Sequence, residues 1–437
     1  MTHTESTDHV AASARPSPHQ AWNTGALVVD TVLFGVGMAF ISPTVVLPSF
    51  VAALTDSEVI VGLAAGLTSA GWLLPQLVVA SATARLTKKK PVIVRAAWTS
   101  RLLLLLVALA IWLFGQQLPA LTLVVGLAGV FVFFALDGVV SVLWFDVLAK
   151  VLPHTRRGRI LGTSQFVGGL GAIGAGMAVR FILSKEGPWA FPNNYALLFA
   201  LASIPFLVGA VCLSAIREPE SRLPDKGVPS TRKVLSLLPG MLVRDRPFLR
   251  LVAVRLLGGC ISVASAFYVL YATRNLGLST DAVGLFVSAQ VVGSLTAGLL
   301  MTVIQDRWGP LIHIRTLRVL SAIPPVIALC VGRMPGVLGQ HVLYPYMLTY
   351  FFLGLSMGSG FWPYVNWIIE YANEVQRPLY IGALNTLGAL SLLAPLLGGW
   401  VARSISYPAV FGLALVFSVS SLLASFALPD TRRRPSG

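Results

Sequence analysis

The chain has 437 residues, of which 56% are hydrophobic and only 11% are charged. An ordinary soluble domain has about 25% charged residues, so this composition excludes one and indicates a protein that folds in a lipid bilayer. The formal net charge is +15, but lysine and arginine lie in alternate short loops and no basic groove interleaved with aromatic residues is found. Nucleic-acid binding is therefore not expected.

Residues 1–21 are polar and lack the basic and apolar segments of a cleaved signal peptide. We therefore expect them to form a disordered cytoplasmic tail. The three cysteines, Cys212, Cys260 and Cys330, all lie in apolar segments. They predict neither a disulfide framework nor a metal site.

Twelve apolar runs follow the tail, and each is close to the ~20 residues that a helix needs to cross the hydrocarbon core of a bilayer. They lie at residues 25–50, 59–82, 92–115, 119–148, 159–183, 194–215, 249–273, 281–304, 313–333, 342–370, 378–402 and 406–428. The pattern predicts an all-α membrane protein with twelve transmembrane helices.

Basic residues accumulate in every second loop, after the second, fourth, sixth and eighth runs, and again at the end of the chain. The opposite loops carry few charges. By the positive-inside rule both termini are cytoplasmic. We expect a multi-pass protein of the plasma membrane, which in bacteria is the inner membrane.

The polar segment 217–247 separates two groups of six runs and is rich in proline, arginine and lysine. It either lies along the inner membrane face through an amphipathic patch at residues 233–241 or is a plain solvated linker. We therefore divide the chain into an N-terminal six-helix bundle (22–216), this cytoplasmic linker, a C-terminal six-helix bundle (248–428) and a cytoplasmic tail (429–437).

The two halves of the chain also resemble each other. A shift of 220 residues places basic, glycine and amide positions of one half on similar positions of the other. The matched pairs are Arg157 with Arg377, Gly162 with Gly382 and Gln165 with Asn385, and the same shift pairs Lys150 with Glu370 and Asp146 with Asn366. A weak repeat of this kind is typical of secondary transporters with two parallel halves.

Asp137 lies in the middle of the fourth apolar run. An ionisable residue inside a span is costly, so it is by default a functional-site hypothesis. Ser141 and Trp144 follow it at helical spacing, whereas Asp146 lies about half a turn around the helix. The two acids therefore cannot share one site. We assign Asp137 to transport and Asp146 to the cytoplasmic gate.

Three stretches of the chain carry a resemblance to a known family. Asp306-Arg307-Trp308-Gly309 is similar to an Asp-Arg-x-Gly loop motif, residues 153–162 to an Arg-Gly-x-x-x-Gly helix entry, and residues 394–399 to a helix-bending signature. Together with the twelve spans, they make the chain resemble a member of the major facilitator superfamily. The resemblance implies two pseudo-symmetric six-helix bundles that rock around a central site to give alternating access.

The resemblance also implies a set of gating residues. Asp306 would cap the start of the fifth helix near Gly158, where the helix dipole favours an anion. Arg307 and Arg85 would tie the bundles together in the outward-facing state. Three further residues complete the set: Arg157, its repeat partner Arg377, and Glu370, the repeat partner of Lys150. The alternative is that these loop charges only signal topology.

In the family, the first, fourth, seventh and tenth helices line the central cavity. Here these helices supply the candidate substrate and proton residues, to which we add Gln290 in the eighth: Asp30, Asp137, Ser141, Trp144, Arg255, Gln290, Trp362 and Asn366. Desolvation favours the neutral form of a buried carboxyl group, and a nearby cation favours the charged form. Asp137 or Asp30 could thus exchange a proton, with Arg255 stabilising the charged form of Asp137 or binding an anionic substrate. The alternative is a fixed Asp–Arg pair that does not titrate.

Some subfamily signatures are missing. Phe134 occupies the position of an arginine typical of the family's drug–proton antiporters, the fifth run has no proline, and sugar-porter signatures are absent. The sequence therefore leaves the substrate open.

The prediction is a secondary active transporter of a small organic solute, coupled to protons, with efflux favoured, acting as a monomer without a cofactor. The alternatives are an uncoupled facilitator or uptake permease, and a transporter-like receptor or scaffold that docks partners on residues 217–247. An enzyme is not expected, because the helices carry no metal-ligand histidine cluster, Ser–His–Asp set or phosphate-binding loop.

Overall fold

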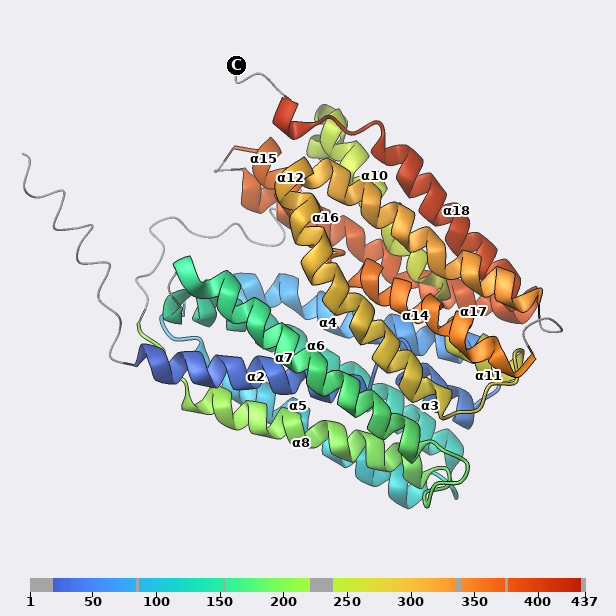
Figure 1. Ribbon diagram of the computed structural model, residues 1–437. Helices are drawn as coiled ribbons and strands as arrows, with labels where there is room; N and C mark the ends of the chain where they lie inside the picture. The colour runs from blue at the N-terminus through green and yellow to red at the C-terminus, as the bar shows by residue number, and fades with distance from the viewer. Residues whose placement is uncertain are drawn as a thin grey trace, which may run out of the picture.

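The structure is a computed structural model that describes residues 19–83, 86–152, 154–220, 239–334, 339–373 and 376–433. Within these segments every regular element is a helix. Most of the expected N-terminal tail and of the amphipathic patch at 233–241 lies outside them. Figure 1 shows two groups of helices side by side, the first half of the chain in blue to green and the second in yellow to red.

The first half makes six crossings with seven helices. These are α2 (Gln20–Phe40), α3 (Val46–Leu54), α4 (Glu58–Ala82), α5 (Lys90–Phe114), α6 (Pro119–Val151), α7 (His154–Ile182) and α8 (Asn193–Ala215). The sequence predicted one uninterrupted helix at 25–50, but a break at residues 41–45 divides it into α2 and α3. Pro43 lies in this break, where it removes a backbone donor and disfavours helical geometry at the residue before it.

The second half makes six crossings with helices that are more often interrupted. They are α10 (Arg246–Cys260), η1 (Ile261–Ala264), α11 (Phe267–Arg274), α12 (Ala282–Gly332), α14 (Leu343–Met357), α15 (Trp362–Tyr371), α16 (Arg377–Gly388), η3 (Ala389–Leu393), α17 (Ala394–Ser404) and α18 (Tyr407–Ser425). The four-residue break between α14 and α15 is followed by Pro363, in the first turn of α15. Discontinuous helices leave free backbone groups at mid-membrane depth, as transporters require at their sites.

Ten stretches of the described chain are long and apolar enough to cross a membrane. One of them, α12, holds two crossings, because Gly309 has a φ of 81° and turns the chain between its two parts. The pair α14–α15 supplies another crossing, which its break hides from a search for continuous helices. The twelve predicted spans are therefore confirmed.

The two halves pack against each other mainly through two helix pairs, α4 with α17 and α7 with α12. We call the side where α2 begins and α8 ends the termini side, and the opposite side the far side. The close approaches lie toward the far side: a Cβ at Gly62 would be 2.2 Å from the Pro395 carbonyl oxygen, and one at Gly284 would be 2.3 Å from that of Gly176. Glycine lets these backbones approach, because any side chain would separate them.

The internal repeat predicted from the sequence has a structural counterpart. Arg157 Nε donates to the Leu152 carbonyl oxygen at 2.9 Å, and Arg377 Nε donates to that of Ala372 at 3.1 Å. Both arginines thus reach back five residues to the end of the preceding helix, at positions that differ by 220. The same local fold at both positions shows that the halves share one architecture.

Candidate functional site

A buried ion pair lies in the middle of the first half. Arg101 Nη2 on α5 donates to Asp137 Oδ1 on α6 at 3.0 Å, and the two side chains are only 3% and 5% exposed. The guanidinium also lies over the rings of Phe133 and Phe206, 5.8 and 5.5 Å from their centroids. The partner of Asp137 is thus Arg101, not Arg255, which belongs to the other half of the molecule.

Asp30 on α2 lies close to this pair. It is 8% exposed and accepts one hydrogen bond, from Trp144 Nε1 at 3.0 Å. Arg101 and Asp137 both act electrostatically on Asp30. A Cβ at Gly209 would lie 2.9 Å from Asp30 Oδ1, so the glycine leaves room for the carboxyl group. Two acids and one arginine therefore form a cluster, which we call the acid cluster (Asp30, Arg101, Asp137).

Ser141 lies at the edge of the acid cluster. Its hydroxyl donates to the Gly138 carbonyl oxygen at 2.9 Å and accepts from Gln76 Nε2 at 3.4 Å. Trp144, one turn further along α6, reaches across to α2 through its bond to Asp30. The face predicted to carry Asp137, Ser141 and Trp144 thus points inside the half, toward α2, α4 and α5.

Asp146 lies in a separate site at the termini side, as its position on α6 predicted. It pairs with Lys89, next to the Lys150–Glu218 pair, whose Nζ and Oε1 atoms are 2.5 Å apart. Glu218 also accepts from the backbone N–H groups of Lys89 at 2.8 Å and Lys90 at 2.7 Å. Burial raises the pKa of Glu218, but the hydrogen bonds from Lys150, Lys90 and Lys89 outweigh it and hold the pKa below its usual value. This set, which we call the first-half latch, ties α5 and α6 to the segment after α8.

The second half has a similar set of contacts at the equivalent place, but an arginine takes the part that Glu218 has in the first-half latch. Glu370, at the end of α15, pairs with Arg432 in the segment after α18, at 3.3 Å. Arg432 also donates to the carbonyl oxygens of Gln305 and Asp306, each at 3.1 Å. In the first half a glutamate thus accepts from backbone N–H groups of the loop before α5, whereas here an arginine donates to backbone carbonyls in α12.

Within the part of the chain that the structure describes, the other predicted gating residues form no hydrogen bond or ion pair between the halves. The side chains of Asp306 and Arg307 are exposed and form no hydrogen bond or ion pair with described residues, so Asp306 does not cap α7 here. Arg85 lies outside the described residues. Arg157 and Arg377 bond to carbonyls of their own halves. The expected contacts between the halves at this level are absent because the close approaches lie on the far side.

Arg274, at the end of α11, joins the halves on the far side. Its Nη1 atom is 3.1 Å from Glu58 Oε1, and its Nη2 atom is 3.8 Å from Asp56 Oδ1. Tyr407 adds a hydrogen bond to Glu58 at 3.2 Å. Arg180 and Asp281 form a second pair between the halves at 3.6 Å, beside a polar cavity of about 540 Å³. Among described residues, every hydrogen bond and ion pair between the halves lies toward this side.

The predicted cavity residues of the second half carry one cation. Arg255 on α10 lies over the ring of Tyr364 on α15, 5.5 Å from its centroid, and its buried Nε has no hydrogen-bond partner among described residues. Asn366 is half-buried, and Trp362 is 56% exposed.

Gln290 on α12 joins both halves near two helix breaks. Thr44, in the α2–α3 break, donates to Gln290 Oε1 at 2.9 Å. The amide nitrogen of Gln290 contacts Met357 Sδ, at the end of α14, at 3.5 Å. Gln290, which the sequence suggested as a substrate or proton residue of the eighth crossing, therefore lies at a contact between the halves.

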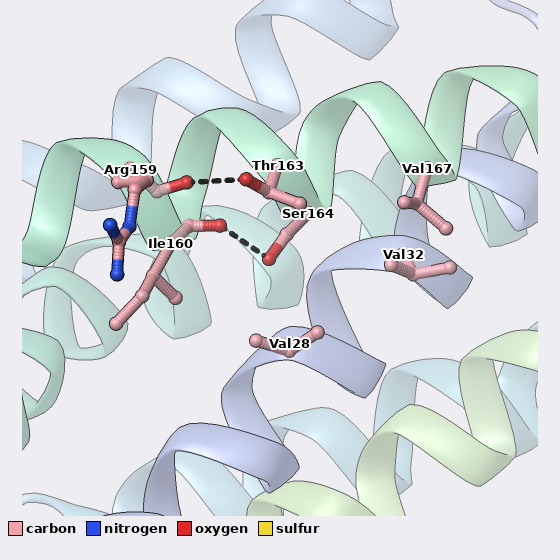
Figure 2. A pocket seen from close by; sticks show the side chains of 7 residues that line it. All are labelled: Val28, Val32, Arg159, Ile160, Thr163, Ser164 and Val167. Atoms are coloured by element: carbon pink, nitrogen blue, oxygen red, sulfur yellow. Dashed lines mark hydrogen bonds between the residues drawn. The ribbon is translucent and has the colours of Figure 1, made fainter.

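A cavity of about 240 Å³ lies between α2 and α7 (Figure 2). Val28, Val32, Ile160 and Val167 make most of its wall, and the hydroxyls of Thr163 and Ser164 are bonded to carbonyls of their own helix. The two helices approach closely at Gly35 and Gly168 and open toward Arg159. Arg159 is the one charged residue of its wall, so this cavity has few polar groups that could bind a ligand specifically.

Sequence reasoning missed Arg101 and Arg274. Arg101 lies inside the apolar run 92–115 and satisfies the rule that singled out Asp137, so the signal was present. Arg274 lies at a run end, where a charge is ordinary, and only the packed structure shows its partners. Among described residues, no three His, Cys, Asp or Glu side chains are grouped as metal ligands.

Twelve crossings in two packed halves, with charged side chains buried at mid-membrane depth, define a polytopic membrane transporter. The family model of the Major Facilitator Superfamily matches residues 31–391 and 260–437. The chain belongs to this superfamily, and it is a transporter and not an enzyme.

Several solved transporter structures have a similar fold. A mutant of the nucleoside transporter NupG superposes with a TM-score of 0.70 at 12% identity, covering 93% of this chain and 100% of that one. The xylose transporter XylE from E. coli, in a partially occluded inward open conformation, gives 0.62 at 17% identity, over 96% and 100%. A bacterial homologue of the iron transporter ferroportin in an inward-facing state gives 0.60 at 14%, over 93% and 98%. A search of curated sequences finds no match to this chain.

Proposed function

We propose that this protein is a proton-coupled secondary transporter that moves a small organic solute by alternating access. The observation that carries the proposal is the acid cluster, in which two carboxyl groups share one guanidinium at mid-membrane depth. With both acids ionised the cluster has a net charge of −1, and one bound proton makes it neutral. A site that gains or loses one proton as it meets one side and then the other is what coupling requires.

Asp30 is the better of the two proton candidates. Its one hydrogen bond comes from a neutral indole, so protonating it breaks no direct ion pair. Protonating Asp137 would leave Arg101 as a buried cation without its partner, which is costly. Asp137 and Arg101 then serve as the fixed charge that sets the field at Asp30.

We further propose that both termini are cytoplasmic, on the evidence of the basic loops, and that the protein lies in the inner membrane of a bacterium. The termini side is then the inner side, and the far-side contacts of Arg274 and Gly62 close the outer side. The conformation is then inward-facing, as it is in two of the similar structures. Export is the favoured direction of transport, uptake is the alternative, and we expect a monomer.

The test uses proteoliposomes that contain the whole protein and a pH-sensitive dye. A panel of solutes, beginning with uridine and D-xylose, is screened for counterflow, and the best substrate is then driven by a proton gradient. We expect Asp30→Asn to retain counterflow and to lose proton-driven accumulation at least tenfold. Glu186→Gln, which removes an exposed acid, is the control and should behave as wild type. Accumulation by Asp30→Asn at the wild-type level would refute coupling through Asp30.

A second candidate is an uncoupled facilitator. The observation that favours it is the tight, nearly inaccessible Asp137–Arg101 pair, which has the geometry of a structural lock. It predicts that Asp30→Asn and wild type transport equally down a gradient and that neither accumulates solute.

A further inference from the structure

Among described residues, the spans of the second half hold three arginines with a buried Nε, Arg255, Arg315 and Arg318, and no acid away from their ends. Arg315 donates to the Ser425 carbonyl oxygen at 3.5 Å and lies over the ring of Phe426. Between residues 248 and 433 the described acids are Asp281, Asp306, Glu370 and Asp430, and they lie at helix ends, beside the Gly309 turn of α12 or in loops. Arg255 on α10 and Arg318 on α12 lie inside the spans. Neither forms an ion pair with a described residue, and both have a buried Nε without a hydrogen-bond partner there.

The two arginines lie at similar depth. Arg255 is nine residues from the start of α10 and Arg318 is eight residues beyond Pro310, which places both roughly 12–14 Å from the termini side. Both also flank one short stretch of α10. A Cβ at Gly258 would be 2.2 Å from Arg318 Nη1, and one at Gly259 would be 4.0 Å from Arg255 Nη1. The charge of Arg318 acts on Arg255. Two like charges are thus held near each other at mid-membrane depth.

The internal repeat shows which acids of the first half have no counterpart in the second half. The shift of 220 pairs Asp137 with Met357 and Trp144 with Tyr364. Arg318 lies near the counterpart position of Arg101, at a shift of 217, and the position that corresponds to Asp137 holds a thioether, which contacts Gln290. Likewise Trp144 contacts an acid on α2, whereas Tyr364 contacts Arg255 on α10. Near the positions that correspond to the acid cluster, the second half therefore has buried arginines but no acid.

Uncompensated cations in a low-dielectric interior are costly, and a bound anion relieves this cost. Arginine offers two parallel N–H donors, which match the two oxygens of a carboxylate or phosphate group. Arg255 is half-buried, and Arg318, which is 6% exposed, acts on it electrostatically. We propose that the transported solute is an organic oxyanion whose carboxylate or phosphate binds Arg255, with Arg318 adding to the field. This inference rests on the proposed transport function and names its substrate class.

The test measures binding without transport. The full-length protein in detergent is titrated with benzoate, phenyl phosphate, inorganic phosphate and citrate at constant ionic strength, with benzamide and benzyl alcohol as neutral analogues. Thermal unfolding reports binding, because a ligand of the folded state raises the transition temperature. We expect at least one anion to stabilise the wild type, its neutral analogue to have no effect, and Arg255→Gln to lose at least tenfold in affinity.

Three variants separate the explanations. Arg250→Gln removes an exposed arginine on the same helix and should bind the anion as wild type does. Arg255→Lys keeps the charge without the paired donors and should retain part of the affinity, which also covers the case in which Arg255→Gln does not fold. Asp30→Asn should keep anion binding even if it loses coupling. The proposal is overturned if none of the four anions stabilises the wild type, if the neutral analogues bind equally, or if both Arg255 variants bind normally. Loss of transport with intact anion binding would instead refute the proposed function.

Discussion

The far side and the termini side of this molecule are held together in different ways. On the far side, bonds run between the halves, as in the contact of Arg274 with Glu58. On the termini side, the strong charge pairs, Lys150–Glu218 and Glu370–Arg432, each stay within one half. We therefore expect the far-side contacts to break when the halves move apart and the termini-side latches, which lie within one half, to persist.

Gly62→Ala should have the largest effect on this contrast. A Cβ at Gly62 meets the Pro395 backbone at 2.2 Å, so α4 and α17 must separate. Overpacking of this kind costs about 1–3 kcal/mol, here only in the far-side-closed state, so the ratio of closed to open molecules should fall ~5–150-fold. Spin labels at Gln116 and Ser404, both exposed, report this as a longer distance in a cysteine-free background. Gly298→Ala, with nothing within 4 Å of the new Cβ, is the control. An unchanged distance in Gly62→Ala would show that the halves do not need this contact.

Glu218→Gln should lower stability without changing the ratio of the two states. The substitution weakens a charged hydrogen bond to Lys150, which costs about 1–3 kcal/mol. Because the pKa of Glu218 is lowered in the folded protein, its stabilisation is present above the ordinary pKa of about 4.3 and is lost as the pH falls through the lower, folded value. The difference in thermal unfolding between wild type and variant should therefore be full at pH 7 and should shrink below about pH 4. A difference that stays constant down to pH 3 would contradict this account.

Arg274→Gln should have the smallest effect. In contrast to Glu218→Gln, it should change the ratio of the two states and not the thermal stability. Its side chain is 29% exposed and that of Glu58 is 19% exposed, so solvent screening limits the pair to about 1 kcal/mol or less. We expect up to a ~fivefold shift toward far-side opening, by the same spin-label distance, and little change in thermal stability. The exchange variant Arg274→Glu with Glu58→Arg should restore part of the closed population. If thermal stability falls and the distance does not change, the pair belongs to the fold and not to the gate.

The fold was accessible from the sequence because hydrophobic length alone fixes a membrane crossing. The twelve runs and the repeat that pairs Arg157 with Arg377 were both visible. The break around Pro43 was missed because apolar residues flank Ser42, Pro43 and Thr44 on both sides, so the run as a whole remains hydrophobic. Hydropathy does not distinguish a helix from an unwound turn.

The site was accessible only in part. Helical spacing shows which side chains share a face, so it separated Asp137 from Asp146. It does not show which helix that face meets, so Arg101 was missed as the partner of Asp137 and Arg255 was considered instead. Contacts between the halves, such as Arg274–Glu58, also depend on how the two halves pack in a given conformation. The sequence does not show this packing.

If the halves rock against each other as proposed, we expect the hydrogen bond from Thr44 to Gln290 to lie near the hinge line. Among described residues it is the hydrogen bond between the halves that lies furthest from the far-side end of α12, eight residues past Ala282. When one rigid body tilts against another, displacement grows with distance from the hinge line, so atoms near that line scarcely move. We therefore expect the hydrogen bond of Gln290 to persist during transport while the contact between Arg274 and Glu58 breaks.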